Sequence, residues 1–242
     1  MTTTPGASEG AALASLRSPD AGGTRTLVVP LGSVEQHGPH LPLGTDGVIA
    51  EGVCRWLAGS RSADRDWVVG PLVPFGASGE HEDFPGTVSI GHQQLAGYLV
   101  ELVRSASRWV PRVRFITGHG GNAPALGAAC RLLASEGRDA AWTGVELPRA
   151  DAHAGHTETS LMLHLAPRTV RMDLAQAGCT APLERILPAL VDGGVRAVSP
   201  SGVLGDPVGA TAPEGARLFA QLCEAVADRL AAGRRDADGR LR

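Results

Sequence analysis

The sequence predicts a single α/β domain built on a largely parallel sheet. Short runs rich in Val and Leu, typical of buried strands, alternate along the chain with longer Ala- and Leu-rich segments typical of helices. Hydrophobic residues make up 43% of the 242 residues and charged residues 19%, so the chain can bury a sizeable core. No internal repeat or linker divides the sequence. Strands that alternate with helices favour a parallel sheet covered by helices.

The expected elements follow from composition and spacing. Short apolar runs predict strands at residues 25–31, 67–73, 113–117 and 140–145. Apolar periodicity predicts helices at 48–58, 92–109, 123–135, 157–165 and 214–232, with a short helix at 9–16. Polar, Gly- and Pro-rich stretches predict loops at 32–46, 74–91 and 193–213, and residues 168–186 are expected to be irregular, with at most a helical turn before Pro188. Residues 1–23 are expected to form a flexible arm, 24–234 the single domain, and 235–242 a frayed tail.

Composition excludes several classes of function. The net charge is -3, which leaves no basic surface for nucleic acid. All 22 basic residues are Arg, and the absence of Lys excludes Schiff-base chemistry and a Walker-type phosphate loop. The four cysteines form no CxxC pair, and no apolar run approaches the ~20 residues that a membrane span needs. We therefore expect a soluble, cytoplasmic protein with neither a nucleic-acid nor a membrane partner.

Two strand-end loops carry residues that suit a divalent metal. Glu35 and His37 alternate by two after a buried strand, so an extended segment would point both to one side, and Asp46 follows after a turn. One imidazole and two carboxylates suit a hard or borderline cation. His119 lies in the glycine-rich turn after the strand at 113–117 and is a further expected ligand. Asn122 lies three residues after His119, where the helix at 123–135 is expected to begin, so it could serve as the N-cap of that helix.

Two further segments carry titratable groups. His153 is a candidate general acid or electrophile, and Glu158 lies in the first turn of an expected helix, where the helix dipole favours a carboxylate. Glu80 and His81 lie in a glycine-containing loop that could act as a substrate lid, although a lone loop histidine is more often an ordinary polar residue. No GxSxG elbow and no cysteine beside a histidine is present, so metal-activated water is favoured over covalent catalysis.

Three long motifs together resemble the creatininase family of metal-dependent amidohydrolases: PLGSVEQHGPHLPLGTD, TGHGGN and DAHAGHTETS. The resemblance extends from about residue 27 to residue 230 and implies a catalytic domain with a creatininase-like three-layer α/β/α sandwich. It also implies two divalent ions per chain, with zinc, iron and manganese not distinguished. Asp46 would bridge the two ions, whose ligands would be Glu35, His37, Asp46, His119 and Glu158. Creatininase has a Glu where this chain has Gly121, and Glu158 is the expected substitute for that ligand.

Other segments narrow the resemblance to a peptidase branch of the family. PFGASGEHEDFPGTVSIG and AGCTAPLERILPALVDGGVRAVSPSGVLGDP resemble enzymes that release the modified C-terminal Val-Tyr end of a ribosomally made precursor peptide. By this resemblance Glu158 and His153 would serve catalysis, while Glu80, His81 and Asn122 would contact the substrate. A homo-oligomer, commonly a hexamer in the family, is implied. The alternatives are a small-molecule amidohydrolase or deformylase and a non-catalytic metalloprotein that binds peptide.

Overall fold

A four-stranded parallel sheet forms the centre of the molecule. The structure is a computed structural model that describes residues 12–23, 25–59, 67–148 and 150–242. The strand order is β2-β1-β3-β4, with bounds β1 Thr26–Leu31, β2 Trp67–Val69, β3 Arg112–Thr117 and β4 Asp139–Gly144. Leu31 pairs with Thr117, and Thr117 pairs with Gly144, so three strands end level at one edge of the sheet.

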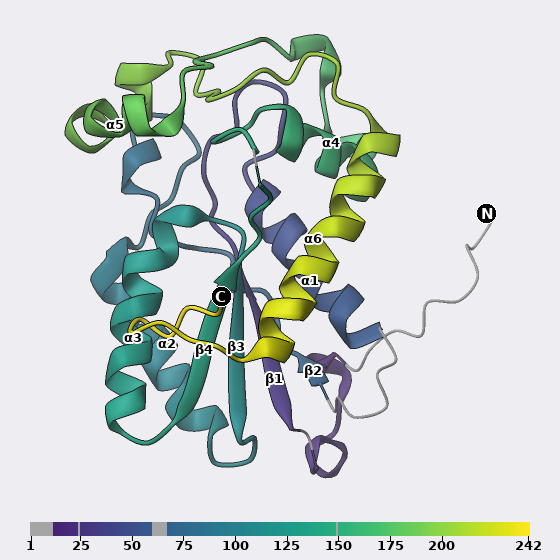
Figure 1. Cartoon of the computed structure of the whole chain (residues 1–242), viewed down its shortest axis with the longest axis vertical. Helices are drawn as coiled ribbons and strands as arrows, with labels where there is room; N and C mark the ends of the chain where they lie inside the picture. The colour runs from purple at the N-terminus through teal and green to yellow at the C-terminus, as the bar shows by residue number, and fades with distance from the viewer. Residues whose placement is uncertain (1–11, 24, 60–66, 149) are drawn as a thin grey trace.

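Helices cover both faces of this sheet (Figure 1). The helices are α1 Thr45–Gly59, α2 Gly91–Ala106, α3 Ala123–Ser135, α4 His156–Leu165, α5 Leu183–Val198 and α6 Ala212–Ala232. Leu27, Val29 and Leu31 of β1 pack in one core cluster with α2 and α3, whereas Val28 packs in another with α1, α4 and α6. Alternate β1 side chains therefore face opposite layers. The predicted three-layer α/β/α sandwich is confirmed.

The segment around α5 differs from the prediction. Residues 168–186 were expected to be irregular and 193–213 to be a loop, but α5 occupies 183–198. Pro188 lies inside this helix, and Gly194, with φ 67°, interrupts it at a kink. The sequence did not predict this helix, because a proline or a pair of glycines normally ends a helix. α5 lies beyond the sheet edge at which the strands end (Figure 1).

The C-terminal segment is ordered against β4 and is not the expected frayed tail. Leu241 is 2% exposed, and its N–H donates to the carbonyl of Trp142 at 2.8 Å. The Trp142 N–H in turn donates to the carbonyl of Gly239 at 3.1 Å. A buried leucine and backbone pairing hold the last residues on the domain.

The N-terminal arm also contributes to the core where it is described. Leu13 and Leu16 pack against the cluster formed with α2 and α3. Residues 1–11 lie outside the described part of the chain, and so does the first part of the helix expected at 9–16; its described part is a 3-10 turn at Leu13–Ser15. Among the described residues, no helix has the length and apolar content needed to cross a membrane.

Candidate metal centre

The level strand ends bring the predicted ligands together. α1 begins at Thr45, so Asp46 lies in the first turn of a helix, where its carboxylate is favoured, and not in the expected loop. The turn after β3 approaches α1 closely, because a Cβ at Gly118 would lie 2.2 Å from the carbonyl oxygen of Asp46. Glycine at 118 therefore allows His119 to lie beside Asp46.

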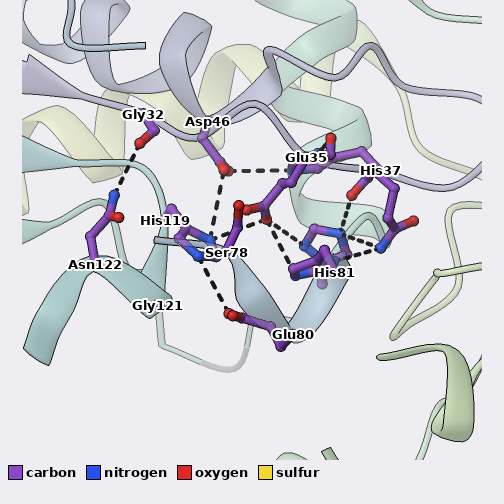
Figure 2. A network of polar contacts seen from close by, with 12 residues as sticks. Gly32, Glu35, His37, Asp46, Ser78, Glu80, His81, His119, Gly121 and Asn122 are labelled. Carbon is purple, nitrogen blue, oxygen red and sulfur yellow. Dashed lines mark hydrogen bonds and ion pairs between the residues drawn. The ribbon is translucent and has the colours of Figure 1, made fainter. Parts of the chain in front are cut away.

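Two groups of potential ligands share Asp46, and Figure 2 shows its contacts to His37 and His119. One ligand atom from each member lies within 4.8 Å of the others in three groups: Glu35, Asp46 and His119; His37, Asp46 and Glu158; and Glu35, His37 and His153. The Oδ1 atom of Asp46 lies 3.3 Å from His37 Nε2, and its Oδ2 atom lies 3.8 Å from His119 Nδ1. His119 Nδ1 is 3.1 Å from Glu35 Oε1. His37 Nε2 is 3.9 Å from Glu158 Oε2. Asp46 thus presents one oxygen to each of the first two groups.

Backbone carbonyls set the orientation of the two histidine rings. The Nδ1 atom of His37 lies 3.1 Å from the Glu35 carbonyl, and Nε2 of His119 lies 3.1 Å from the Ala77 carbonyl. A carbonyl oxygen only accepts, so each of these nitrogens carries a proton. The other nitrogen of each ring then faces the carboxylates. This arrangement of a donated N–H behind a free nitrogen is typical of metal-bound histidines.

The buried charges fit a divalent cation. Within the described residues, both carboxylate oxygens of Glu35, Oδ2 of Asp46 and Nε2 of His37 are buried without a hydrogen bond, which is unusual for buried polar atoms. Burial lowers the pKa of His37, but the carboxylates, led by Asp46, outweigh burial and raise that pKa to about 10. The pKa of His119 is likewise raised well above its usual value by Glu35 against the effect of burial. The carboxylates thus favour positive charge on both rings, and a divalent cation would supply that charge in place of the ring protons.

The three predicted substrate-binding residues differ in position. Glu80 and His81 line a cavity beside the centre, and Glu80 Oε1 also lies 3.4 Å from His119 Nε2. Asn122 does not line this cavity: its side chain is fully buried and turned away from the ligands (Figure 2). Its carboxamide accepts from the Ala77 N–H and donates to the Gly32 carbonyl. Asn122 is the N-cap residue of α3, but its side chain makes no capping hydrogen bond. Asn122 therefore cross-links backbone segments that support the site.

The cavity beside the centre has a polar floor and an apolar wall. Its volume is about 850 Å³, and Asp46, His119, His153 and Glu158 line it. The apolar wall comes from α5 and consists of Leu183, Leu187, Leu190 and Val191. Leu187 is 50% exposed and Val191 80% exposed, so a molecule in the cavity can contact these side chains.

We expect Gly121→Ala to weaken metal binding. A Cβ at position 121 would lie 2.3 Å from His119 Nε2 and 2.6 Å from Glu80 Oε1, so the imidazole ring must move. Loss of an interaction that orients a ligand typically costs about 10–100-fold in metal affinity. Competition with a fluorescent chelator measures this loss. Gly120→Ala is the matched control, since nothing lies within 4 Å of a Cβ there, and equal affinities for the two variants would refute the steric explanation.

We also expect chelation to lower the melting temperature. A ligand present at 100 times its dissociation constant stabilises the native state by about 2.7 kcal/mol. For a chain of this size, about 2–4 °C per kcal/mol gives a loss of roughly 5–10 °C. Thermal melts with chelator and with added zinc measure the difference. Asp46→Ala, which lacks the ligand shared by both groups, should melt at the same temperature under both conditions, and a shift as large as that of the wild type would contradict this site.

The fold and the site define an α/β protein with a carboxylate- and histidine-rich metal centre at the carboxyl edge of its sheet. The family profile described as "Creatininase: Creatinine amidohydrolase" matches residues 15–230. The chain therefore belongs to the creatininase family, a family of metal-dependent amidohydrolases that hydrolyse C–N bonds. The predicted family resemblance is confirmed.

Relatives and solved structures agree with this assignment. The chain is 54% identical over 217 residues to "Mycofactocin precursor peptide peptidase" of Mycolicibacterium smegmatis, covering 89% of this chain and 88% of that protein. It is 49% identical over 222 residues to the protein of the same name from Mycobacterium tuberculosis, with the same coverage. It is 28% identical to "Creatinine amidohydrolase" of Pseudomonas putida, over 63% of this chain and 69% of that protein. A solved creatininase superposes with a TM-score of 0.74 at 23% identity, covering 93% of this chain and 98% of that one.

Proposed function

We propose that this protein is a metal-dependent peptidase that hydrolyses the modified mycofactocin precursor peptide and releases its C-terminal Val-Tyr-derived part. The observation that carries this proposal is the distribution of identity. Identity is 54% over 89% of the chain to a relative named as that peptidase, against 28% over 63% to a creatinine amidohydrolase. Gly121 also separates this chain from creatininase, which has a Glu at this position. In this chain a side chain at position 121 would collide with His119 and Glu80.

The proposed ligand set follows the two groups that share Asp46. Glu35, Asp46 and His119 would hold one divalent ion, and His37, Asp46 and Glu158 would hold the second. Such ions supply Lewis-acid chemistry, because they polarise a carbonyl and lower the pKa of water. Zinc, iron and manganese all suit these ligands.

His153 is positioned to carry the proton of the reaction. Its Nε2 atom lies 2.8 Å from the Gln36 carbonyl and so carries a proton, while its Nδ1 atom faces Glu35 at 3.8 Å. Burial, with neighbouring His37 and His81, lowers the pKa of His153 well below its usual value, which keeps the ring neutral. Nδ1 therefore begins unprotonated and is placed to receive a proton from water as its oxygen attacks the amide carbon, and the lowered pKa favours release of that proton. The same proton passes to the leaving nitrogen as the C–N bond breaks.

The apolar wall of α5 supports a peptide substrate and gives a testable expectation. Burying a leucine against an apolar group contributes about 1.5–3 kcal/mol. If substrate contacts Leu187 equally in the ground and transition states, Leu187→Asp should raise KM by about 10–100-fold with little change in kcat. Steady-state kinetics on the modified peptide measure both constants.

Leu132→Asp provides a matched control for this variant. Leu132 is a similarly exposed helical leucine, at 46% against 50%, and it does not line the cavity. It should keep the wild-type KM. An unchanged KM in Leu187→Asp, or an equal rise in both variants, would show that the apolar wall of α5 does not contact the substrate.

The decisive test compares substrates directly. Purified protein is incubated with modified peptide, unmodified peptide and creatinine, and the products are read by mass spectrometry. We expect cleavage of the modified peptide, with one oxygen-18 atom entering the new carboxylate in labelled water. Hydrolysis of creatinine with no action on the modified peptide would overturn the substrate, and a trapped acyl-enzyme would overturn the mechanism.

We also propose a cytoplasmic homo-oligomer. The four cysteines are free thiols, which suits a reducing compartment. Sedimentation analysis tests the assembly, and a hexamer is the expected state.

A further inference from the structure

Gln36 lies between two proposed ligands and connects three segments of the site. Its side chain is almost buried, at 5% exposure. The carboxamide oxygen accepts from the Gly38 N–H at 2.9 Å, and the carboxamide nitrogen donates to the Gly202 carbonyl at 3.0 Å. The same nitrogen lies 2.8 Å from His81 Nδ1. The backbone carbonyl of Gln36 also accepts from His153 at 2.8 Å.

These partners determine the protonation of His81. The Gly38 N–H can only donate and the Gly202 carbonyl can only accept, so the carboxamide has a single consistent orientation. Its nitrogen also lies 3.1 Å from His153 Nε2, but that atom donates to the Gln36 carbonyl and cannot accept. The second N–H is therefore directed at His81 Nδ1, which must accept and carries no proton. In the neutral ring the proton therefore resides on Nε2, which lies 3.4 Å from Glu35 Oε1.

His153 has the same Nε2–H tautomer, but it presents its other, unprotonated nitrogen to this carboxylate. Its Nε2 proton is held by the Gln36 carbonyl, so Nδ1 is free and lies 3.8 Å from Glu35 Oε1. The His81 and His153 rings are neighbours, with centroids 4.4 Å apart. One ring thus offers Glu35 a donor, while the other offers a free nitrogen that can accept a proton.

We infer that Gln36 is a positioning residue that fixes these two tautomers. Through its carboxamide it keeps a proton on Nε2 of His81, the nitrogen 3.4 Å from Glu35 Oε1, and a nitrogen that carries a proton cannot coordinate a metal ion. His81 therefore orients a ligand and is not itself one. Through its backbone carbonyl Gln36 leaves Nδ1 of His153 free. This inference rests on the proposed metal centre for its consequence, but the tautomers themselves do not depend on a bound ion.

The first test reads the tautomer directly. Long-range proton–nitrogen NMR on the full chain with labelled histidines distinguishes protonated from unprotonated ring nitrogens, and His81→Asn assigns the His81 signals. We expect an unprotonated Nδ1 in the wild type. In Gln36→Glu, a carboxylate oxygen replaces the N–H that faces His81, so Nδ1 should carry a proton. A protonated Nδ1 in the wild type, or no change in Gln36→Glu, overturns the inference regardless of any metal or substrate.

The second test is a double-mutant cycle on zinc affinity. Gln36→Met and His81→Asn should each weaken zinc binding by about 10–100-fold, as loss of an outer partner does. Because Gln36 acts through His81, the double variant should bind no more weakly than the weaker single variant. Thr87→Val is the control: it removes the hydroxyl that accepts the Gln36 backbone N–H at 3.0 Å and leaves the carboxamide intact, so its affinity should equal the wild type. Additive losses, or an equal loss in Thr87→Val, would show a general loosening of the loop and overturn the positioning role.

Discussion

Asp46→Ala should lose metal from both proposed sites and abolish hydrolysis. Asp46 is the member shared by two ligand groups, and its two oxygens face different histidines, His37 at 3.3 Å and His119 at 3.8 Å. Removing one electrostatic stabiliser of a transition state typically costs about 10²–10³-fold in kcat. Asp46→Ala removes a ligand of both proposed ions, so we expect a loss at least this large. Metal analysis by plasma mass spectrometry after desalting, with peptide cleavage on the same sample, measures the result.

Asp139→Ala is the matched control. It shows whether metal loss is specific to Asp46 or follows from removing any carboxylate that forms an ion pair. Asp139 lies in β4 and pairs with Arg114 at 2.9 Å, in no proposed ligand group, so its removal should leave the metal content unchanged. Thermal melts of both variants establish that the chains are folded. If Asp46→Ala keeps two equivalents of metal and full activity, the shared role of Asp46 is wrong.

The fold was predictable where local pattern and packing agree. The strand at residues 113–117 and the helix at 123–135 lie where the apolar runs placed them, because both bury the side chains that gave the pattern. α5 was missed because Pro188 and Gly194 are both helix-breaking residues, and the structure accommodates them at a kink. Tertiary packing overrides local propensity there.

The site was predictable where the type of side chain, carboxylate or imidazole, itself marks a potential metal ligand. Glu35, His37 and His119 follow buried strands, and parallel strands that end level bring such residues together. Gln36 could not be found this way, because its role depends on contacts to residues 45, 117 and 166 positions away in the sequence. The resemblance assigned Asn122 to the substrate, whereas its hydrogen bond to the Gly32 carbonyl appears only in three dimensions.

Glu158→Gln should remove one of the two ions and retain the other. Glu158 belongs only to the group with His37 and Asp46, whereas Glu35, Asp46 and His119 remain intact. The carboxylate accepts from the Ala154 N–H at 2.6 Å, and a glutamine oxygen can keep that bond, so the local backbone should persist. We expect one equivalent of metal per chain by plasma mass spectrometry and a fall in kcat of about 10²–10³-fold.

Glu80→Gln tests whether this loss is specific to the second group. Glu80 is a carboxylate on the same cavity and lies 3.4 Å from His119 Nε2, but it belongs to none of the three ligand groups. It should therefore retain two equivalents of metal, with a loss of affinity confined to the ion that His119 holds. If Glu158→Gln keeps both equivalents, the second site is completed by another residue. If it loses both, the two ions bind as one unit, and the assignment of Glu158 to a separate site is wrong.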